Sequence, residues 1–128
     1  MFNDKVILVT GGTGSFGKAF IRRVLKEYTP KKIINFSRDE LKQFELQEEI
    51  PHRDNVRYFL GDIRDKERLS RAFSGVDIIV HTAAMKQVEA SEYNPFEAIK
   101  TNIIGSENII SEAIANKVKD VMVLSTDK

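Results

Sequence analysis

Three glycines at positions 11, 14 and 17 have the spacing G-x-x-G-x-x-G, which is typical of a phosphate-binding turn. The apolar run Lys5–Val9 precedes them and an amphipathic segment follows. A strand, a glycine turn and a helix N-terminus together seat a pyrophosphate, because the first N–H groups of a helix are free donors. The first glycine permits the tight turn, the second lets phosphates approach the backbone, and the third lets helix and strand pack closely. The predicted cofactor-binding residues of this turn are Gly11, Thr13, Gly14, Ser15, Phe16 and Gly17.

The residues after the second apolar run bear on which dinucleotide the chain prefers. An NAD site tends to place a carboxylate there, whereas Ser37, Arg38 and Lys42 offer a hydroxyl and two cations. Because Arg grips a phosphate through two charge-assisted hydrogen bonds, this set favours NADP, with NAD as the weaker prediction. Two alternatives stay open. Ser37 merely caps the next helix while the cations are solvated, or Asp39 turns inward and favours NAD.

Two further turns complete the predicted nucleotide site. Asp62 is placed to accept from the adenine amine and Ile63 to cover the ring, although Asp62 is equally well explained as closing a turn. Ala83 and Ala84 are small residues where the backbone must pass close to a cofactor. Lys86, the charge in that loop, meets a phosphate, a ribose hydroxyl or a substrate, or is solvated.

Redox chemistry at a nicotinamide needs a proton-transfer group beside the carbon that is oxidised. The Tyr-x-x-x-Lys pattern of short-chain dehydrogenases occurs at Tyr28 and Lys32, but these residues span a helix end and a strand start, at the wrong edge of the sheet. The run Ser125-Thr126-Asp127-Lys128 follows the last apolar run, at the correct edge. An acid and an amine there can divide the donor and acceptor roles, and a surface ion pair is the alternative.

Alternating strand and helix patterns must position these residues. Apolar runs predict strands at 5–9, 32–36, 56–60, 77–80 and 121–124. Five strands and four intervening helices predict a Rossmann-type α/β fold, a doubly wound parallel sheet with strand order 3-2-1-4-5. In such a sheet ligands bind beyond the carboxyl ends of the strands, between strands 1 and 4. His81, near the end of the fourth strand, is expected to pack beside the cofactor without chemistry.

The ends and faces of the helices are predicted from capping residues and periodicity. The first helix runs from Ser15 to about Tyr28, and a capping box of Ser37 and Glu40 starts the second, which ends at 49 or 50. Asp65 caps the third, and Gly75 stops it. The fourth begins at Asn94 and fades near 116. Its apolar residues recur at spacings of 4, 7 and 4, namely Ile99, Ile103, Ile110 and Ile114.

Bulk composition excludes several classes of function. The chain has 128 residues, enough for one domain but not two, so residues 1–128 are predicted to form a single dinucleotide-binding domain. A net charge of +1 gives no electrostatic case for nucleic acid or an anionic membrane. Apolar runs are too short for a membrane span, and no signal-peptide pattern opens the chain. With no cysteine there is no thiolate metal site, and no other metal-ligand cluster emerges, so a reducing cytoplasm suits the chain.

Taken together, the loops resemble the inverting UDP-N-acetylglucosamine 4,6-dehydratases, which belong to the extended short-chain dehydrogenase/reductase superfamily and serve bacterial surface-glycan synthesis. The similarity covers nearly all of the chain, and its most specific parts are Ser-Arg-Asp-Glu and Ser-Thr-Asp-Lys. The stretches that carry it are VTGGTGSFG (9–17), FSRDE (36–40), GDIRD (61–65), AAMKQV (83–88), EYNP (92–95), KTNIIG (100–105) and LSTDK (124–128).

The resemblance implies a tightly held NADP that is used and regenerated within one turnover. It implies that Lys128 is the base at sugar carbon 5 and that Asp127 is the acid for the leaving hydroxyl. Lys86 lies near cofactor and substrate, and Ser125 and Thr126 lie near the reacting sugar, by the same similarity. The partner is then a UDP-sugar, and the full-length protein is expected to be a homo-oligomer.

Members of this family are more than twice as long as this chain. We therefore expect residues 1–128 to be an N-terminal portion, truncated after the fifth strand, that lacks the Tyr-x-x-x-Lys helix and the substrate-binding region and is inactive alone. Two other hypotheses stay open: a non-catalytic NADP-binding sensor or scaffold, and a related nucleotide-sugar epimerase or reductase.

Overall fold

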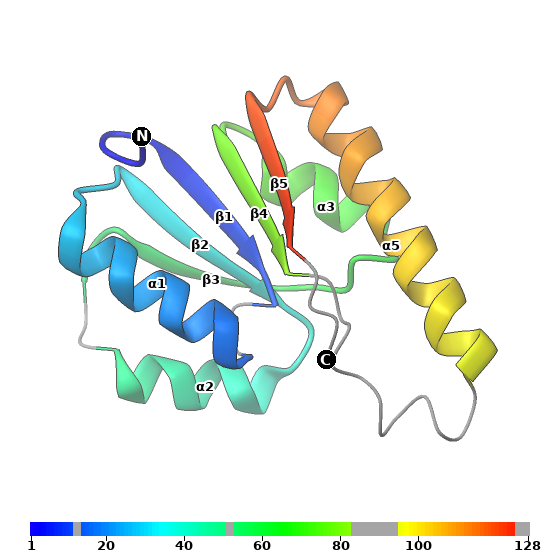
Figure 1. The fold of residues 1–128 in the computed structure, drawn as a ribbon, viewed down its shortest axis with the longest axis horizontal. Coiled ribbons are helices and arrows are strands. Elements are labelled where there is room, and N and C mark those ends of the chain that lie inside the picture. The colour runs from blue at the N-terminus through cyan, green and yellow to red at the C-terminus, as the bar shows by residue number, and fades with distance from the viewer. Residues whose placement is uncertain (12–13, 51–52, 83–94, 125–128) are drawn as a thin grey trace.

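The computed structural model describes residues 1–11, 14–50, 53–82 and 95–124 (Figure 1). Within them the chain alternates between strands and helices. The strands are β1 (Val6–Thr10), β2 (Lys32–Ser37), β3 (Val56–Leu60), β4 (Ile78–Thr82) and β5 (Asp120–Leu124). The helices are α1 (Ser15–Glu27), α2 (Glu40–Glu49), α3 (Lys66–Phe73) and α5 (Pro95–Ala115).

All five strands are parallel and stand in the order β3-β2-β1-β4-β5, which confirms the predicted Rossmann-type topology. The register places Val9 of β1 beside Asn35 of β2 and Val80 of β4. The order reverses between β1 and β4, so the carboxyl ends of these two strands flank the switch point where ligands bind in such sheets.

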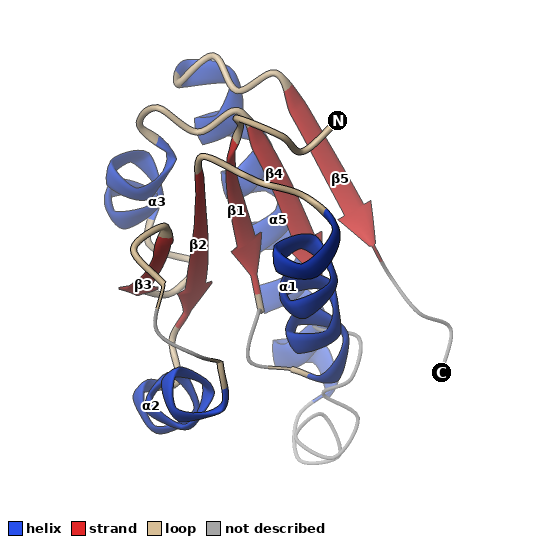
Figure 2. Ribbon diagram, turned by 90° about the vertical axis from the view of Figure 1, so that its left-hand side faces the viewer, coloured by secondary structure: helices blue, strands red, loops and turns tan. Residues whose placement is uncertain are grey.

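Helices cover both faces of the sheet (Figures 1 and 2). On one face α1 and α2 pack over a cluster that includes Ile7, Val9 and Ile33, all fully buried. On the other face α3 and α5 pack over Leu8, Phe36 and Ile79. Burial on both sides explains why the strands read as continuous apolar runs. No helix among the described residues is long and apolar enough to cross a membrane.

The apolar face predicted for the last helix is wrong where it can be checked. Ile110 and Ile114 are 49% and 73% exposed, whereas Ile109 and Ala113 are buried at 0% and 2%. The reason lies one turn earlier, at Gly105. A Cβ there would lie 2.2 Å from Cδ1 of Ile63. Because Gly105 has no side chain, Ile63 can pack against the helix at this position, and the face formed by residues 105, 109 and 113 points inward. The side chains of Ile99 and Ile103, and the cap Asn94, lie outside the described residues.

The third helix follows its prediction. Asp65 is the N-cap of α3 and accepts the backbone N–H of Arg68 at 3.2 Å. Gly75, just past the end of the helix, has φ +78°, a conformation that glycine adopts without strain.

Candidate dinucleotide site

The helix that follows β1 lacks the cap that its neighbours have. Asp39 caps α2 by accepting the N–H of Lys42 at 3.0 Å, and Asp65 caps α3 in the same way. By contrast, α1 starts after Gly14, which offers no side-chain hydrogen bond, and its first turn contains no acidic residue. Among the described residues, no side chain caps the first N–H groups of α1, and the positive end of the helix dipole suits an anion.

The turn that leads to α1 requires glycine at its first position. Gly11 has φ +72°, and its N–H donates to the carbonyl oxygen of Phe36 at 3.1 Å. An added Cβ on Gly11 would lie 2.3 Å from Oγ1 of Thr82, well inside contact distance. Gly14 differs, because within the part of the chain that the structure describes a Cβ there would meet nothing nearer than the Gly11 carbonyl oxygen at 3.5 Å. Packing within the protein thus requires glycine at position 11 and leaves position 14 open, as a phosphate approaching the backbone there would need.

Buried polar side chains at the ends of β1 and β4 hold this turn in place through a chain of hydrogen bonds. Thr82 Oγ1 donates to the Thr10 carbonyl oxygen at 2.6 Å, and Thr10 Oγ1 lies 2.6 Å from Nδ1 of His81. On the far side of the ring, Nε2 of His81 lies 3.4 Å from Oγ of Ser106 on α5. His81 is 3% exposed, and burial lowers its pKa. A neutral imidazole with hydroxyl groups at both ring nitrogens acts as a structural bridge between the strand ends and α5.

The capping box predicted at Ser37 is wrong. Ser37 is the last residue of β2, and its Oγ accepts the N–H of Asp39 at 3.2 Å. Asp39 is the helix cap instead, because its carboxylate reaches the N–H three residues ahead, as an N-cap must. The Asp39 carboxylate is therefore engaged in starting α2.

Two arginines share the carboxylate after β3. Arg64 binds Asp62 through Nη2 at 2.8 Å and Nε at 3.2 Å, and Arg38 forms a longer ion pair with it at 3.7 Å. The Arg64 side-chain hydrogen bonds are the main reason why the pKa of Asp62 is lowered. The N–H of Arg64 also donates to Asp62 Oδ1 at 2.9 Å, so this carboxylate does close the turn. Ile63 packs toward Gly105, and the adenine contacts of Asp62 and Ile63 remain predictions.

The predicted site residues fall into two groups. The structure places the first group at the carboxyl ends of β1, β2 and β3, in the last residue of β2 and in the turns and helix starts that follow these strands: Gly11, Gly14, Ser15, Phe16, Gly17, Ser37, Arg38, Asp39, Lys42, Asp62 and Ile63. The second group lies outside the described residues: Thr13, Ala83, Ala84, Lys86, Ser125, Thr126, Asp127 and Lys128.

Sequence reasoning missed several buried polar side chains near the site. Gln43 of α2 donates to two carbonyl oxygens, and Thr10 and Thr82 belong to the chain described above. His81, the third member of that chain, was expected to pack near the site, but its hydrogen bonds were not predicted. Neither amide atom of the buried Asn35 has a hydrogen-bond partner in the structure as described. The available signal was the polar residues inside runs that otherwise read as buried strands.

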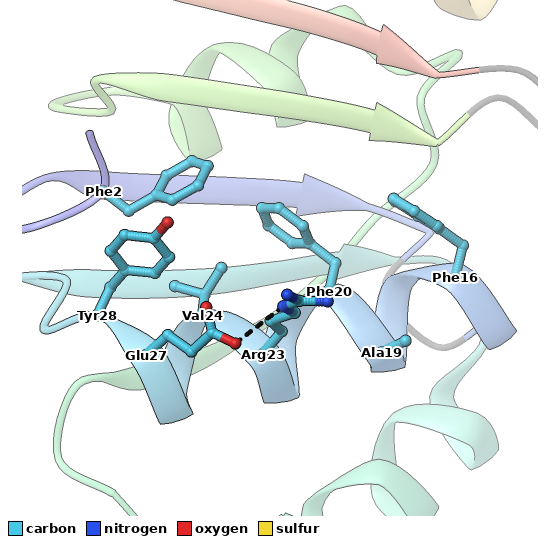
Figure 3. A pocket seen from close by; sticks show the side chains of 8 residues that line it. All are labelled: Phe2, Phe16, Ala19, Phe20, Arg23, Val24, Glu27 and Tyr28. Atoms are coloured by element: carbon cyan, nitrogen blue, oxygen red, sulfur yellow. Dashed lines mark hydrogen bonds and ion pairs between the residues drawn. The ribbon is translucent and has the colours of Figure 1, made fainter.

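A separate cavity of about 340 Å³ lies along α1 (Figure 3). Phe2 meets two rings edge to face, with its centroid 5.6 Å from that of Phe20 and 5.2 Å from that of Tyr28, whereas Phe16 stacks on Phe20 at 6.2 Å. Arg23 and Glu27 pair beside it at 3.0 Å. Apolar and aromatic side chains form most of its lining, and Phe16 is the residue that it shares with the predicted glycine turn. Its lining residues are Phe2, Phe16, Ala19, Phe20, Arg23, Val24, Glu27 and Tyr28.

The reversed strand order, the positive-φ glycine and the uncapped α1 define a Rossmann-type domain whose donor set fits a dinucleotide pyrophosphate. Residues 7–128 match the polysaccharide biosynthesis protein family, and the chain belongs to that family.

Named relatives agree with this assignment. The chain is 57% identical over its whole length to a UDP-N-acetylglucosamine 4,6-dehydratase (inverting) of Campylobacter jejuni, and spans 38% of that protein. It is 47% identical to a UDP-glucose 4-epimerase of Rickettsia typhi, again covering all of this chain and 38% of the relative. The X-ray structure of Pen from Bacillus thuringiensis superimposes on 94% of this chain and 38% of its own, with a TM-score of 0.87 and 50% identity.

Proposed function

We propose that this chain is the NADP-binding part of a C5-inverting UDP-N-acetylglucosamine 4,6-dehydratase, a lyase of bacterial surface-glycan synthesis. The observation that carries the proposal is the 57% identity to such a dehydratase along all 128 residues. The uncapped N-terminus of α1 beyond a positive-φ glycine supports the nucleotide half of the proposal independently.

The phosphorylated dinucleotide is favoured by the chemistry of the Ser37–Asp39 turn. The Asp39 carboxylate caps α2 through Oδ1, so its position is set by the helix start and one of its two oxygens is already engaged. Ser37 Oγ accepts one hydrogen bond from a backbone N–H, so its own hydrogen is available to a phosphate oxygen. Arg38 is 64% exposed on its side chain and has a 3.7 Å ion pair with Asp62 that it can exchange for a phosphate.

In the proposed reaction, the N–H groups of the first turn of α1 hold the pyrophosphate, while Ser37 and Arg38 hold the 2′-phosphate. When bound, NADP would accept a hydride from sugar carbon 4 and return it to carbon 6. Lys128 removes the proton at carbon 5, and Asp127 protonates the leaving hydroxyl at carbon 6. Water is thereby lost across carbons 5 and 6, and later protonation from the opposite face inverts carbon 5.

The remaining assignments also belong to the proposal. Lys86 lies near cofactor and sugar, and Ser125 and Thr126 contact the sugar. Because the chain spans 38% of the dehydratase it resembles, the region that holds the UDP-sugar is proposed to lie outside residues 1–128, which do not complete turnover alone. The complete enzyme is proposed to be a cytoplasmic homo-oligomer.

Mass spectrometry of the reaction product tests the proposal. The full-length polypeptide, incubated with UDP-N-acetylglucosamine and NADP, should release a nucleotide sugar that has lost one water, and NMR should show a 4-keto-6-deoxy sugar with inverted carbon 5. The 47% identity to a UDP-glucose 4-epimerase favours a second candidate, an epimerase. An epimerase would leave the substrate mass unchanged, and tight NADP binding without any turnover would identify a sensor or scaffold.

A further inference from the structure

Gln43 joins three secondary-structure elements at the edge of the candidate site. It lies in the first half of α2 and is 5% exposed. Its Nε2 donates to the carbonyl oxygen of Ser37 at 3.0 Å and to that of Phe59 at 3.1 Å. A side-chain amide carries two hydrogens, so each carbonyl receives one of them. The start of α2 is thereby tied to the ends of β2 and β3.

The turn held by Gln43 is also fixed by its own backbone. The carbonyl oxygen of Ser37 accepts a second hydrogen bond, from the N–H of Gly61 at 2.9 Å. The N–H of Asp39 donates to Ser37 Oγ, and the Asp39 carboxylate caps α2. Arg38 stands between these two fixed residues with its side chain largely exposed. The direction in which Arg38 leaves the backbone thus depends on the hydrogen bonds on either side of it.

We infer that Gln43 is a positioning residue that determines dinucleotide selectivity, since its amide sets where the Ser37 hydroxyl and the Arg38 guanidinium meet a ribose 2′-phosphate. The inference rests on the proposed NADP function. Gln43 does not reach the ligand itself, because it is buried and both its hydrogens are used by main-chain carbonyls. Without the amide, the carbonyl oxygen of Ser37 loses one of the two hydrogen bonds described here, and the backbone that carries Arg38 is held less firmly.

The test is a double-mutant cycle. For each variant, calorimetry measures the dissociation constants of NADP and NAD, and their ratio gives the preference for NADP. Gln43→Met keeps the length of the side chain and removes the donors, and should reduce the preference for NADP about tenfold, chiefly through weaker NADP binding. In an Arg38→Ala background the same change should lower the ratio by clearly less than it does in the wild-type background, because only the Ser37 contact is left to lose. General destabilisation would weaken both dinucleotides alike and would not move the ratio.

Gln47→Met is the matched control, since Gln47 is an exposed glutamine on the same helix. It should leave the ratio unchanged. If Gln43→Met does not fold, Gln43→Leu tests the same loss of donors. A wild-type ratio in the Gln43 variant, or an equal drop in the Arg38→Ala background, overturns the inference while the NADP proposal stands. A wild-type protein that binds both dinucleotides equally overturns the NADP proposal and, with it, the inference.

Discussion

The hydroxyl of Thr82 occupies the space that any side chain at Gly11 would need. Oγ1 of Thr82 lies 2.3 Å from the position of a Cβ on Gly11, and it holds the carbonyl oxygen of Thr10 at 2.6 Å. The end of β4 therefore shapes the turn that follows β1, although the two segments are 71 residues apart along the chain.

Gly11→Ala is expected to destabilise the fold by at least about 2 kcal/mol, because it combines left-handed backbone strain with a clash against Thr82. Urea unfolding measures the loss. The double variant Gly11→Ala/Thr82→Ala removes the clash and should recover part of the stability, whereas Thr82→Ala alone should not stabilise the protein. An unchanged unfolding midpoint in Gly11→Ala would contradict the packing described here.

Gly14→Asp is expected to change stability and binding in opposite directions. Gly14 has φ −77° and ψ 173°, which any residue adopts, so an aspartate there can cap α1 and add a few tenths of a kcal/mol. The same carboxylate occupies and repels the proposed phosphate position, so NADP binding should weaken at least about tenfold. Gly14→Ser, a neutral cap, should lose less affinity. Equal NADP affinity in Gly14→Asp would place the pyrophosphate elsewhere.

Arg38→Ala is expected to weaken NADP binding by about 1.5–3 kcal/mol, the range for a hydrogen bond to a charged group, and to leave NAD binding nearly unchanged. Calorimetric titration with each dinucleotide measures both effects. Arg22→Ala serves as a control, because Arg22 is an exposed arginine that pairs with Glu49 on the neighbouring α2. Equal losses for both dinucleotides would remove Arg38 from the 2′-phosphate site.

His81 makes stability depend on pH in a defined direction. Burial lowers its pKa below the ordinary value of 6.5, so the unfolded chain binds a proton more readily than the folded one. The free energy of unfolding should be highest above pH 6.5, fall as the pH drops through the lowered pKa of the folded state, and lose this dependence below it. Urea unfolding of wild type and His81→Asn, which can still bond Thr10, should give curves that differ in this window. Parallel curves would mean that His81 titrates normally.

Strand positions could be predicted because a strand buried on both faces leaves a continuous apolar run. The ends were harder to predict, since β1 and β4 continue through Thr10, His81 and Thr82, polar residues that the ladder and their side-chain hydrogen bonds accommodate. The inward face of α5 was predicted wrongly because two neighbouring rows of residues on this helix contain apolar side chains at a spacing of four. One row contains Ile110 and Ile114, and the other contains Ile109 and Ala113. The contact between Gly105 and Ile63 determines that the second row is buried.

The site was predictable where its function depends on local sequence, and hidden where it depends on contacts. The glycine turn at Gly11 is local, and its glycine spacing was sufficient to find it. The role of Gln43 depends on the pairing of β2 with β3 and on the packing of α2, which no spacing along the chain expresses. The cap of α2 was misplaced by two residues because Ser37 and Asp39 are both good capping types, and only the length of β2 separates them.

The cap of α2 limits how readily this domain can change its cofactor. The carboxylate that follows β2 is also the one that begins α2, so rotating Asp39 fully toward a ligand would release the N–H of Lys42. Converting the proposed NADP site to NAD through Asp39 would therefore require a replacement cap, and a single exchange at Arg38 would remove the proposed preference without creating a new one.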